Sequence, residues 1–145
     1  QEIHTLVSDD DYLAFPAVIE LGDEVLVSFK RGKAHAADAG ATQELLRLDK
    51  ASGKVLATGT LAAVKGEIMQ MGEWVRFGNG DVANYIDAQA AQGSLRTGLA
   101  VVRSNNGGKT FGPVQRAGVI DGVEFTGFCR PAKRDDECKG RTGLR

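Results

Sequence analysis

The stretch that decides the fold is Val102-Arg103-Ser104-Asn105-Asn106-Gly107-Gly108-Lys109-Thr110-Phe111. An alternating apolar run enters it, and Thr110-Phe111 leaves it into a second strand. Asparagine side chains bond back to nearby backbone amides, and glycine reaches positive φ without steric cost, so this composition is typical of a tight turn between antiparallel strands. We therefore expect a hairpin in which Ser104 and Thr110 bond across the two limbs and Phe111 pins the turn onto the sheet.

A repeat surrounds this turn. Alternating runs at 14–21 and 25–29 predict a hairpin that turns at Gly22-Asp23, and runs at 44–48 and 54–58 predict a second hairpin. The same order recurs at 68–77, 82–88, 96–103 and 111–119. Gly22-Asp23 and Gly80-Asp81 lie 58 residues apart, and Gly53-Lys54 and Gly108-Lys109 lie 55 residues apart. Four short strands per unit at a nearly constant period are typical of a β-propeller blade, with a β-sandwich as the rival architecture.

The repeat predicts a single partial propeller domain over residues 1–145. Its blade-like units cover about 13–60 and 67–119, a third begins over 121–132, and the polar tail 133–145 is expected to be disordered or poorly packed. Closed propellers have about 4–8 blades, so this chain cannot close a ring alone. Uncovered blade faces and strand edges predict either self-association or a place within a larger protein.

Composition excludes several partner classes. Apolar residues make up 42% and charged residues 26% of the chain, and the formal net charge is −1, so neither nucleic acid nor a membrane is expected as a partner. No Walker loop, zinc signature or Gly-x-Ser-x-Gly elbow occurs, and no cofactor or metal is expected. The chain begins at Gln1 without a methionine, which is compatible with processing after export, to a secreted or periplasmic location, or with a boundary inside a longer chain.

Two cysteines, Cys129 and Cys138, lie in the polar C-terminal region. A disulfide or two free thiols are favoured over a metal site, because no histidine or third cysteine lies nearby to complete a zinc shell. Two other polar features carry no predicted role: the acidic run Asp9-Asp10-Asp11 is typical of a solvated segment, and Tyr12 directly follows it.

The turn resembles the Asp-box, or BNR repeat, of sialidases and related β-propellers. The matching positions are Ser104, Asn106, Gly108, Thr110 and Phe111, with Asn106 where that family usually has aspartate. In the family the box braces the fold and lies far from the catalytic centre. The resemblance implies an all-β fold of about two propeller blades and a sialidase-like glycoside hydrolase, which cleaves terminal sialic acid or a related sugar from glycoconjugates.

The first unit resembles the opening blade of exo-sialidases at Phe15-Pro16-Ala17-Val18 and at 25–29. This resemblance places Asp38 as the acid/base and Arg31 and Lys33 as substrate contacts. A proton donor for a glycosidic oxygen needs a place at the mouth of a cleft, which a strand-connecting loop supplies. The alternative for Asp38 is a solvated turn residue. Arg130, which precedes a proline at the start of the third unit, is a further candidate contact, or a surface arginine.

The chain departs from the family pattern at Ala14, where the first blade carries an arginine that grips the substrate carboxylate. Alanine cannot replace a bidentate guanidinium. The family's tyrosine nucleophile comes from later blades, and here Tyr85 is expected to pack with its hydroxyl satisfied. A second hypothesis therefore stands beside the first: a non-catalytic carbohydrate-binding or structural propeller module. His35 is a candidate proton carrier near Asp38, and Trp74 is expected in the core.

Overall fold

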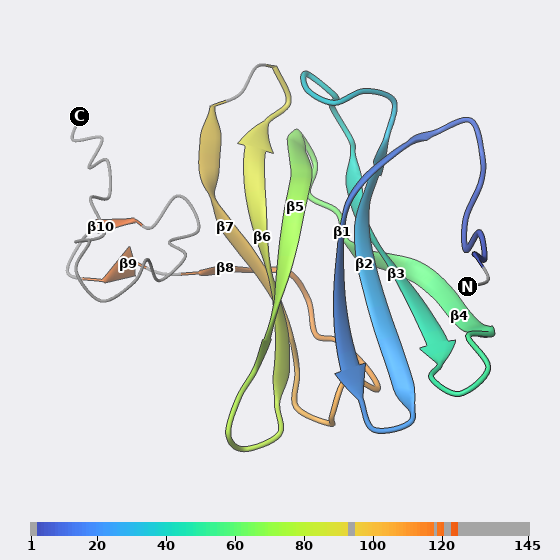
Figure 1. Cartoon of the computed structure of the whole chain (residues 1–145). Coiled ribbons are helices and arrows are strands. Elements are labelled where there is room, and N and C mark those ends of the chain that lie inside the picture. The colour runs from blue at the N-terminus through green and yellow to red at the C-terminus, as the bar shows by residue number, and fades with distance from the viewer. Residues whose placement is uncertain (1–2, 93–94, 118, 121–122, 125–145) are drawn as a thin grey trace, which may run out of the picture.

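The chain folds into two open four-stranded antiparallel sheets (Figure 1). The computed structural model describes residues 3–92, 95–117, 119–120 and 123–124. The first sheet contains β1 (Tyr12–Leu21), β2 (Glu24–Gly32), β3 (Thr42–Asp49) and β4 (Val55–Ala62). The second contains β5 (Glu67–Arg76), β6 (Val82–Ala90), β7 (Arg96–Ser104) and β8 (Gln115–Ala117), and a small ladder joins β9 (Val119–Ile120) to β10 (Val123–Glu124).

The strand order repeats between the two sheets. Each sheet places its strands in chain order, β1-β2-β3-β4 and β5-β6-β7-β8, and every pairing is antiparallel. This confirms the predicted all-β class and the predicted repetition. Residues within the described ranges form no helix, and hence none that could cross a membrane. Most of the predicted third unit and the polar tail, with Arg130, Cys129 and Cys138, lies outside the described residues.

One strand is much shorter than predicted. The sequence favours a strand over 111–119, but β8 covers only Gln115–Ala117. Phe111 turns its ring toward Trp74, with the ring centroids 5.7 Å apart, and the residue after Gly112 is Pro113, which has no amide to donate to β7. The ladder therefore forms only beyond the proline.

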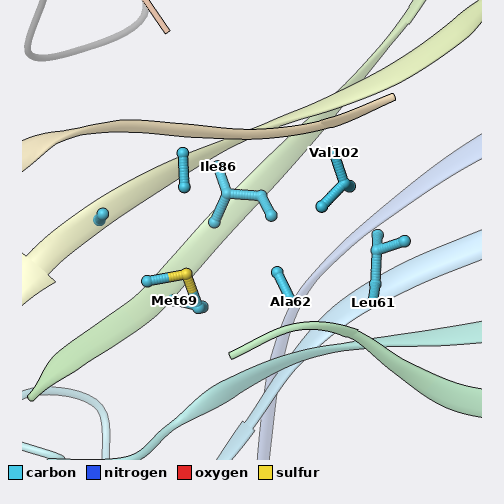
Figure 2. Close-up of a cluster of buried hydrophobic side chains, with 7 residues drawn as sticks. Leu61, Ala62, Met69, Ile86 and Val102 are labelled. Atoms are coloured by element: carbon cyan, nitrogen blue, oxygen red, sulfur yellow. The ribbon is translucent and has the colours of Figure 1, made fainter. Parts of the chain in front are cut away.

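The two sheets pack around a shared apolar core, shown in Figure 2. Leu61 and Ala62 of β4 meet Met69, Ile86, Ala88, Ala100 and Val102 of the second sheet. Trp74 borders this core, as predicted, and its indole nitrogen donates to the carbonyl oxygen of Ala17, 3.2 Å away, in the first sheet. Burying each large aliphatic side chain contributes roughly 1.5–3 kcal/mol, so this core holds the sheets together.

The other face of the first sheet has a separate core. Val27, Phe29, Leu46 and Leu48 form it, and Val7 of the N-terminal segment packs against it. Strand β2 therefore buries both of its faces: Val27 and Phe29 point to this second core, whereas Ser28 points to the second sheet and accepts a hydrogen bond from the amide of Asn84, 3.1 Å away. In Figure 1 the strands β1 and β5 lie side by side where the sheets meet.

A closed set of hydrogen bonds organises the asparagine-rich turn between β7 and β8. The Ser104 hydroxyl donates to Asn106 Oδ1 and accepts from the Gly108 amide, both at 2.8 Å. Asn106 Oδ1 also accepts from the Thr110 amide at 3.0 Å, and Asn106 Nδ2 donates to the Thr110 hydroxyl at 2.8 Å. Gly107 and Gly108 have φ of 69° and 85°, a conformation that favours glycine. Asn106 thus links the two limbs.

The outer side of this turn docks against the first sheet. Arg47 of β3 pairs with Glu24 and donates to the carbonyl oxygens of Gly108 and, at 3.2 Å, Lys109. In the second sheet Arg103, 56 residues after Arg47, pairs with Asp81 at 2.6 Å. The arginine–carboxylate pair is therefore part of the repeat. In the first sheet the arginine of this pair, Arg47, also binds the β7–β8 turn of the second sheet.

Candidate functional site

One end of the first sheet gathers the residues that the sequence singled out. Tyr12 opens β1, Arg31 lies near the end of β2, and Lys33, His35 and Asp38 belong to the loop that joins β2 to β3. Tyr12 pairs with Gly32 across the ladder, which places the start of β1 beside the start of this loop. This end of the sheet is the top in Figure 1, where β6 ends and β7 begins in the second sheet. We refer to this group of five residues as the loop-end cluster.

Beneath the loop lies a fully buried lysine, Lys30, which the sequence did not single out. Its ammonium donates to the carbonyl oxygens of Ala34 at 2.8 Å and His35 at 2.9 Å, and to Gln70 Oε1 at 3.1 Å. Burial lowers the pKa of Lys30 below its ordinary value, and the nearby carboxylate of Asp38 partly opposes this. The available signal was its position in β2, because Lys30 has the same two-residue spacing as the inward-facing residues Leu26 and Ser28 and so lies on their face of the strand.

Asp38 lies beside this lysine and is only 7% exposed. Its Oδ2 accepts hydrogen bonds from the backbone amides of Lys33 at 2.9 Å and Ala34 at 3.2 Å, and lies 3.6 Å from the Lys30 ammonium. These are partners that suit an ionised carboxylate. A Cβ at Gly32 would come within 1.9 Å of the same oxygen, so only glycine lets the carboxylate turn back onto the loop. Asp38 is therefore a residue that shapes the loop from within.

Arg31 and Lys33 are both bound by the acidic N-terminal run. Arg31 Nη1 lies 2.6 Å from Asp9 Oδ2 and 2.9 Å from Asp11 Oδ2, and Lys33 Nζ pairs with Asp11 Oδ1. The contacts with Lys33 and then Arg31 hold the pKa of Asp11 below its usual value. Asp9 and Asp11 raise the pKa of Arg31, and Asp11 raises that of Lys33. The expectation of a merely solvated run is wrong for Asp9 and Asp11.

Two ring side chains of the cluster, Tyr12 and His35, contact each other. The Tyr12 hydroxyl lies 2.9 Å from His35 Nδ1, and the Tyr12 and His35 rings meet edge to face at 6.0 Å between centroids. The Phe15 ring also packs against His35, with 5.6 Å between the ring centroids. Phe15 belongs to a bulge in β1 and has φ of 54°, and Ala37 in the loop has φ of 52°. Such strained residues persist only where the surrounding structure holds them, and they are enriched at functional sites.

The second sheet carries a buried carboxylate at the corresponding end. Asp87 of β6 is 2% exposed, accepts a hydrogen bond from Gln89 Nε2 at 3.1 Å, and lies 3.5 Å from Arg96. Asp87 Oδ1 is buried without a hydrogen-bond partner among the described residues. Sequence reasoning did not point to Asp87, whose hydrogen-bond and ion-pair partners, Gln89 and Arg96, belong to its own sheet.

The remaining predicted positions lie elsewhere. Ala14 pairs with Lys30 across the β1–β2 ladder and contributes no cation, and Tyr85 is partly buried in β6. Ser104, Asn106, Gly108, Thr110 and Phe111 lie in the turn between β7 and β8, away from the loop-end cluster. No group of three or more metal-ligating side chains occurs in the part of the chain that the structure describes.

Comparison of the chain with protein-family models, with curated proteins and with solved structures finds no match.

Proposed function

We propose that this chain is part of a sialidase-like glycoside hydrolase of the β-propeller type, and that the loop-end cluster is its share of the sugar site. The observation that carries the proposal is that Tyr12 of β1 meets Arg31, Lys33, His35 and Asp38, which lie within the single segment 31–38, at one end of a sheet. The resemblance of the asparagine-rich turn to an Asp-box supports the same class.

The propeller arrangement is supported by the repeat. The two sheets have the same strand order, their first strands β1 and β5 are in contact, and β4 of one sheet packs onto the next sheet. The Arg47–Glu24 and Arg103–Asp81 pairs recur at nearly the same spacing as the strands. Further sheets of the same kind, stacked in the same way, are what a closed ring of about 4–8 blades requires.

In this proposal Asp38 protonates the glycosidic oxygen, and Arg31 and Lys33, together with Arg130, bind the carboxylate of an acidic sugar. A guanidinium and an ammonium are suitable partners for a carboxylate. Because Asp9 and Asp11 occupy Arg31 and Lys33, a sugar carboxylate has to displace the N-terminal segment from them. The tyrosine nucleophile of the family is assigned to blades beyond the two sheets.

A non-catalytic carbohydrate-binding or structural module is the second candidate. It is favoured by the partners of Asp38, because a carboxylate held by two amides and an ammonium is poorly placed to donate a proton. Ala14 favours it as well, since the position that the resemblance assigns to a substrate-binding arginine has no charge. In this alternative Asp38 fixes the loop that presents the cluster.

A fluorogenic sialoside separates the two candidates. Turnover by the wild-type chain that is lost in Asp38→Asn and kept in Asp10→Asn supports the hydrolase, because Asp10 is an exposed aspartate of the N-terminal acidic run and makes the same change of charge outside the proposed catalytic group. Sugar binding without turnover, measured by NMR titration with N-acetylneuraminic acid, supports the binding module. If the chain shows neither sugar binding nor turnover, both candidate functions are overturned. Circular dichroism of each variant controls for loss of the sheets.

A further inference from the structure

We infer that His35 is the residue through which the loop-end cluster contacts a sugar, by a hydrogen bond from its Nε2 to a sugar oxygen, and that Tyr12 is the residue that positions it. The inference rests on the proposed function, because it names the contact group of that site. His35 is exposed and Tyr12 is half-buried, whereas Lys30 and Asp38 of the same end of the sheet are buried.

The backbone of His35 is held from two sheets. Its carbonyl oxygen accepts from the ammonium of Lys30 in β2 at 2.9 Å and from the side-chain amide of Gln70 in β5 at 3.0 Å. Lys30 is fully buried and Gln70 is 7% exposed, so these donors are themselves fixed by packing. Buried supports of this kind hold a contact group in place before a ligand arrives.

The ring of His35 is held as well. The Tyr12 hydroxyl bonds to Nδ1 at 2.9 Å, and the rings of Tyr12 and Phe15 both pack against the imidazole. Phe15 reaches this place from a bulge with φ of 54°, which a bulky side chain rarely adopts. When the Tyr12 hydroxyl donates to Nδ1, the ring proton resides on Nε2, and Nε2 becomes a hydrogen-bond donor.

The other polar groups of the cluster are already engaged. Arg31 and Lys33 bind Asp9 and Asp11, and Asp38 binds two amides and lies against Lys30. By contrast, His35 is exposed, and its Nε2 has no hydrogen-bond partner within the described residues. A sugar offers the matching chemistry: hydroxyl oxygens that accept from Nε2, and an apolar ring face that packs on aromatic side chains such as Tyr12 and Phe15.

The test is an NMR titration of the whole chain with N-acetylneuraminic acid and with methyl β-galactoside, observed through the imidazole nitrogens. We expect the His35 signals to report a proton on Nε2 before titration and to shift as sugar binds. His35→Ala is expected to raise the sugar Kd about three- to tenfold, as loss of a single hydrogen bond does. Tyr12→Phe is expected to move the tautomer signature and to raise Kd less, whereas His4→Gln, at the only other histidine, leaves both unchanged.

The outcomes are distinguishable. Sugar binding by the wild-type chain with unmoved His35 signals and an unchanged Kd in His35→Ala overturns this inference and leaves the proposed function standing. Absence of sugar binding by the wild-type chain overturns both. His35→Gln, which keeps a donor near the position of Nε2, restores part of the affinity if the hydrogen bond is the contact, and this separates it from a purely structural role. Amide spectra of each variant control for folding.

Discussion

The ammonium of Lys30 lies 3.6 Å from the carboxylate of Asp38, and the two side chains are 0% and 6% exposed. This buried pair ties the end of β2 to the loop that follows it, and the hydrogen bonds of Lys30 extend the connection to Gln70 in the second sheet. The loop-end cluster therefore depends on a charge pair that is almost fully withdrawn from solvent.

Removing one member of this pair is expected to destabilise the fold strongly. Lys30→Met leaves the Asp38 carboxylate buried without its cation, and a broken buried pair costs about 3–5 kcal/mol. Urea denaturation gives the free energy of unfolding. The double variant Lys30→Met/Asp38→Asn is expected to recover part of the loss, because no buried charge remains. A loss below about 1 kcal/mol in Lys30→Met contradicts the buried pair.

The two turn glycines provide a matched comparison. Gly53 and Gly108 both have positive φ, but a Cβ at Gly53 meets nothing within 4 Å, whereas a Cβ at Gly108 comes within 2.4 Å of Leu21 Cδ1. Gly53→Ala is expected to cost about 1–2 kcal/mol from the backbone conformation alone. Gly108→Ala is expected to cost about 0.5–1.5 kcal/mol more, because the Leu21 side chain has to leave its preferred rotamer to make room for the methyl group. Equal thermal stabilities of the two variants would contradict the close contact between Gly108 and Leu21.

The asparagine of the turn is expected to accept aspartate in its place. Asn106 Oδ1 accepts from Ser104 and Thr110, and a carboxylate oxygen serves both donors equally well. In Asn106→Asp, the bond that Nδ2 donates to the Thr110 hydroxyl is replaced by one that this hydroxyl donates to the carboxylate. We expect Asn106→Asp to be as stable as the wild type, and Asn106→Ala to lose about 1–3 kcal/mol, in thermal or urea unfolding. A large loss in Asn106→Asp contradicts this hydrogen-bond assignment.

The two repeated arginines are expected to differ in their effect on stability. The Arg47 side chain is 16% exposed and binds carbonyl oxygens of the β7–β8 turn, whereas the Arg103 side chain is 51% exposed and pairs with Asp81, which directly precedes β6. Arg47→Ala is expected to cost about 1–3 kcal/mol and Arg103→Ala at most about 1 kcal/mol in urea unfolding. The reverse order argues against Arg47 as the link between the sheets.

The N-terminal segment is expected to detach in acid. Lys33 and Arg31 hold the pKa of Asp11 below its ordinary value of 3.8. A carboxylate with a lowered pKa in the folded state contributes stability that is fully present above 3.8 and is lost as the pH falls through the lower, folded value. The methyl NMR signals of Val7, which packs against the second core, are expected to move toward their free positions as the pH falls from about 5 to below about 4. In Asp11→Asn these signals are already displaced at about pH 5, and an unchanged profile contradicts the contact.

Local sequence patterns were sufficient to predict most of the strands and their order. The alternation in residues 25–29 and 96–103 and the glycine-rich turns were sufficient to predict strands, hairpins and the repeated order, which the structure confirms at the level of two four-stranded sheets. The predicted strand over 111–119 was too long, because alternation does not reveal that Phe111 leaves the ladder to join the core. The sugar chemistry stays a prediction.

The sequence alone therefore determined the features that depend on neighbours along the chain. These are the positive φ at the turn glycines, the asparagine bonds within the β7–β8 turn, and the pairing of consecutive strands. Tertiary structure alone decided which face of β2 meets the second sheet, and with it the burial of Lys30 and its bond to Gln70. It also brought Arg47 to the carbonyl oxygen of Gly108, 61 residues away, and Asp9 and Asp11 to Arg31. Such contacts depend on how whole sheets pack, and the periodicity of a single strand does not encode its partner.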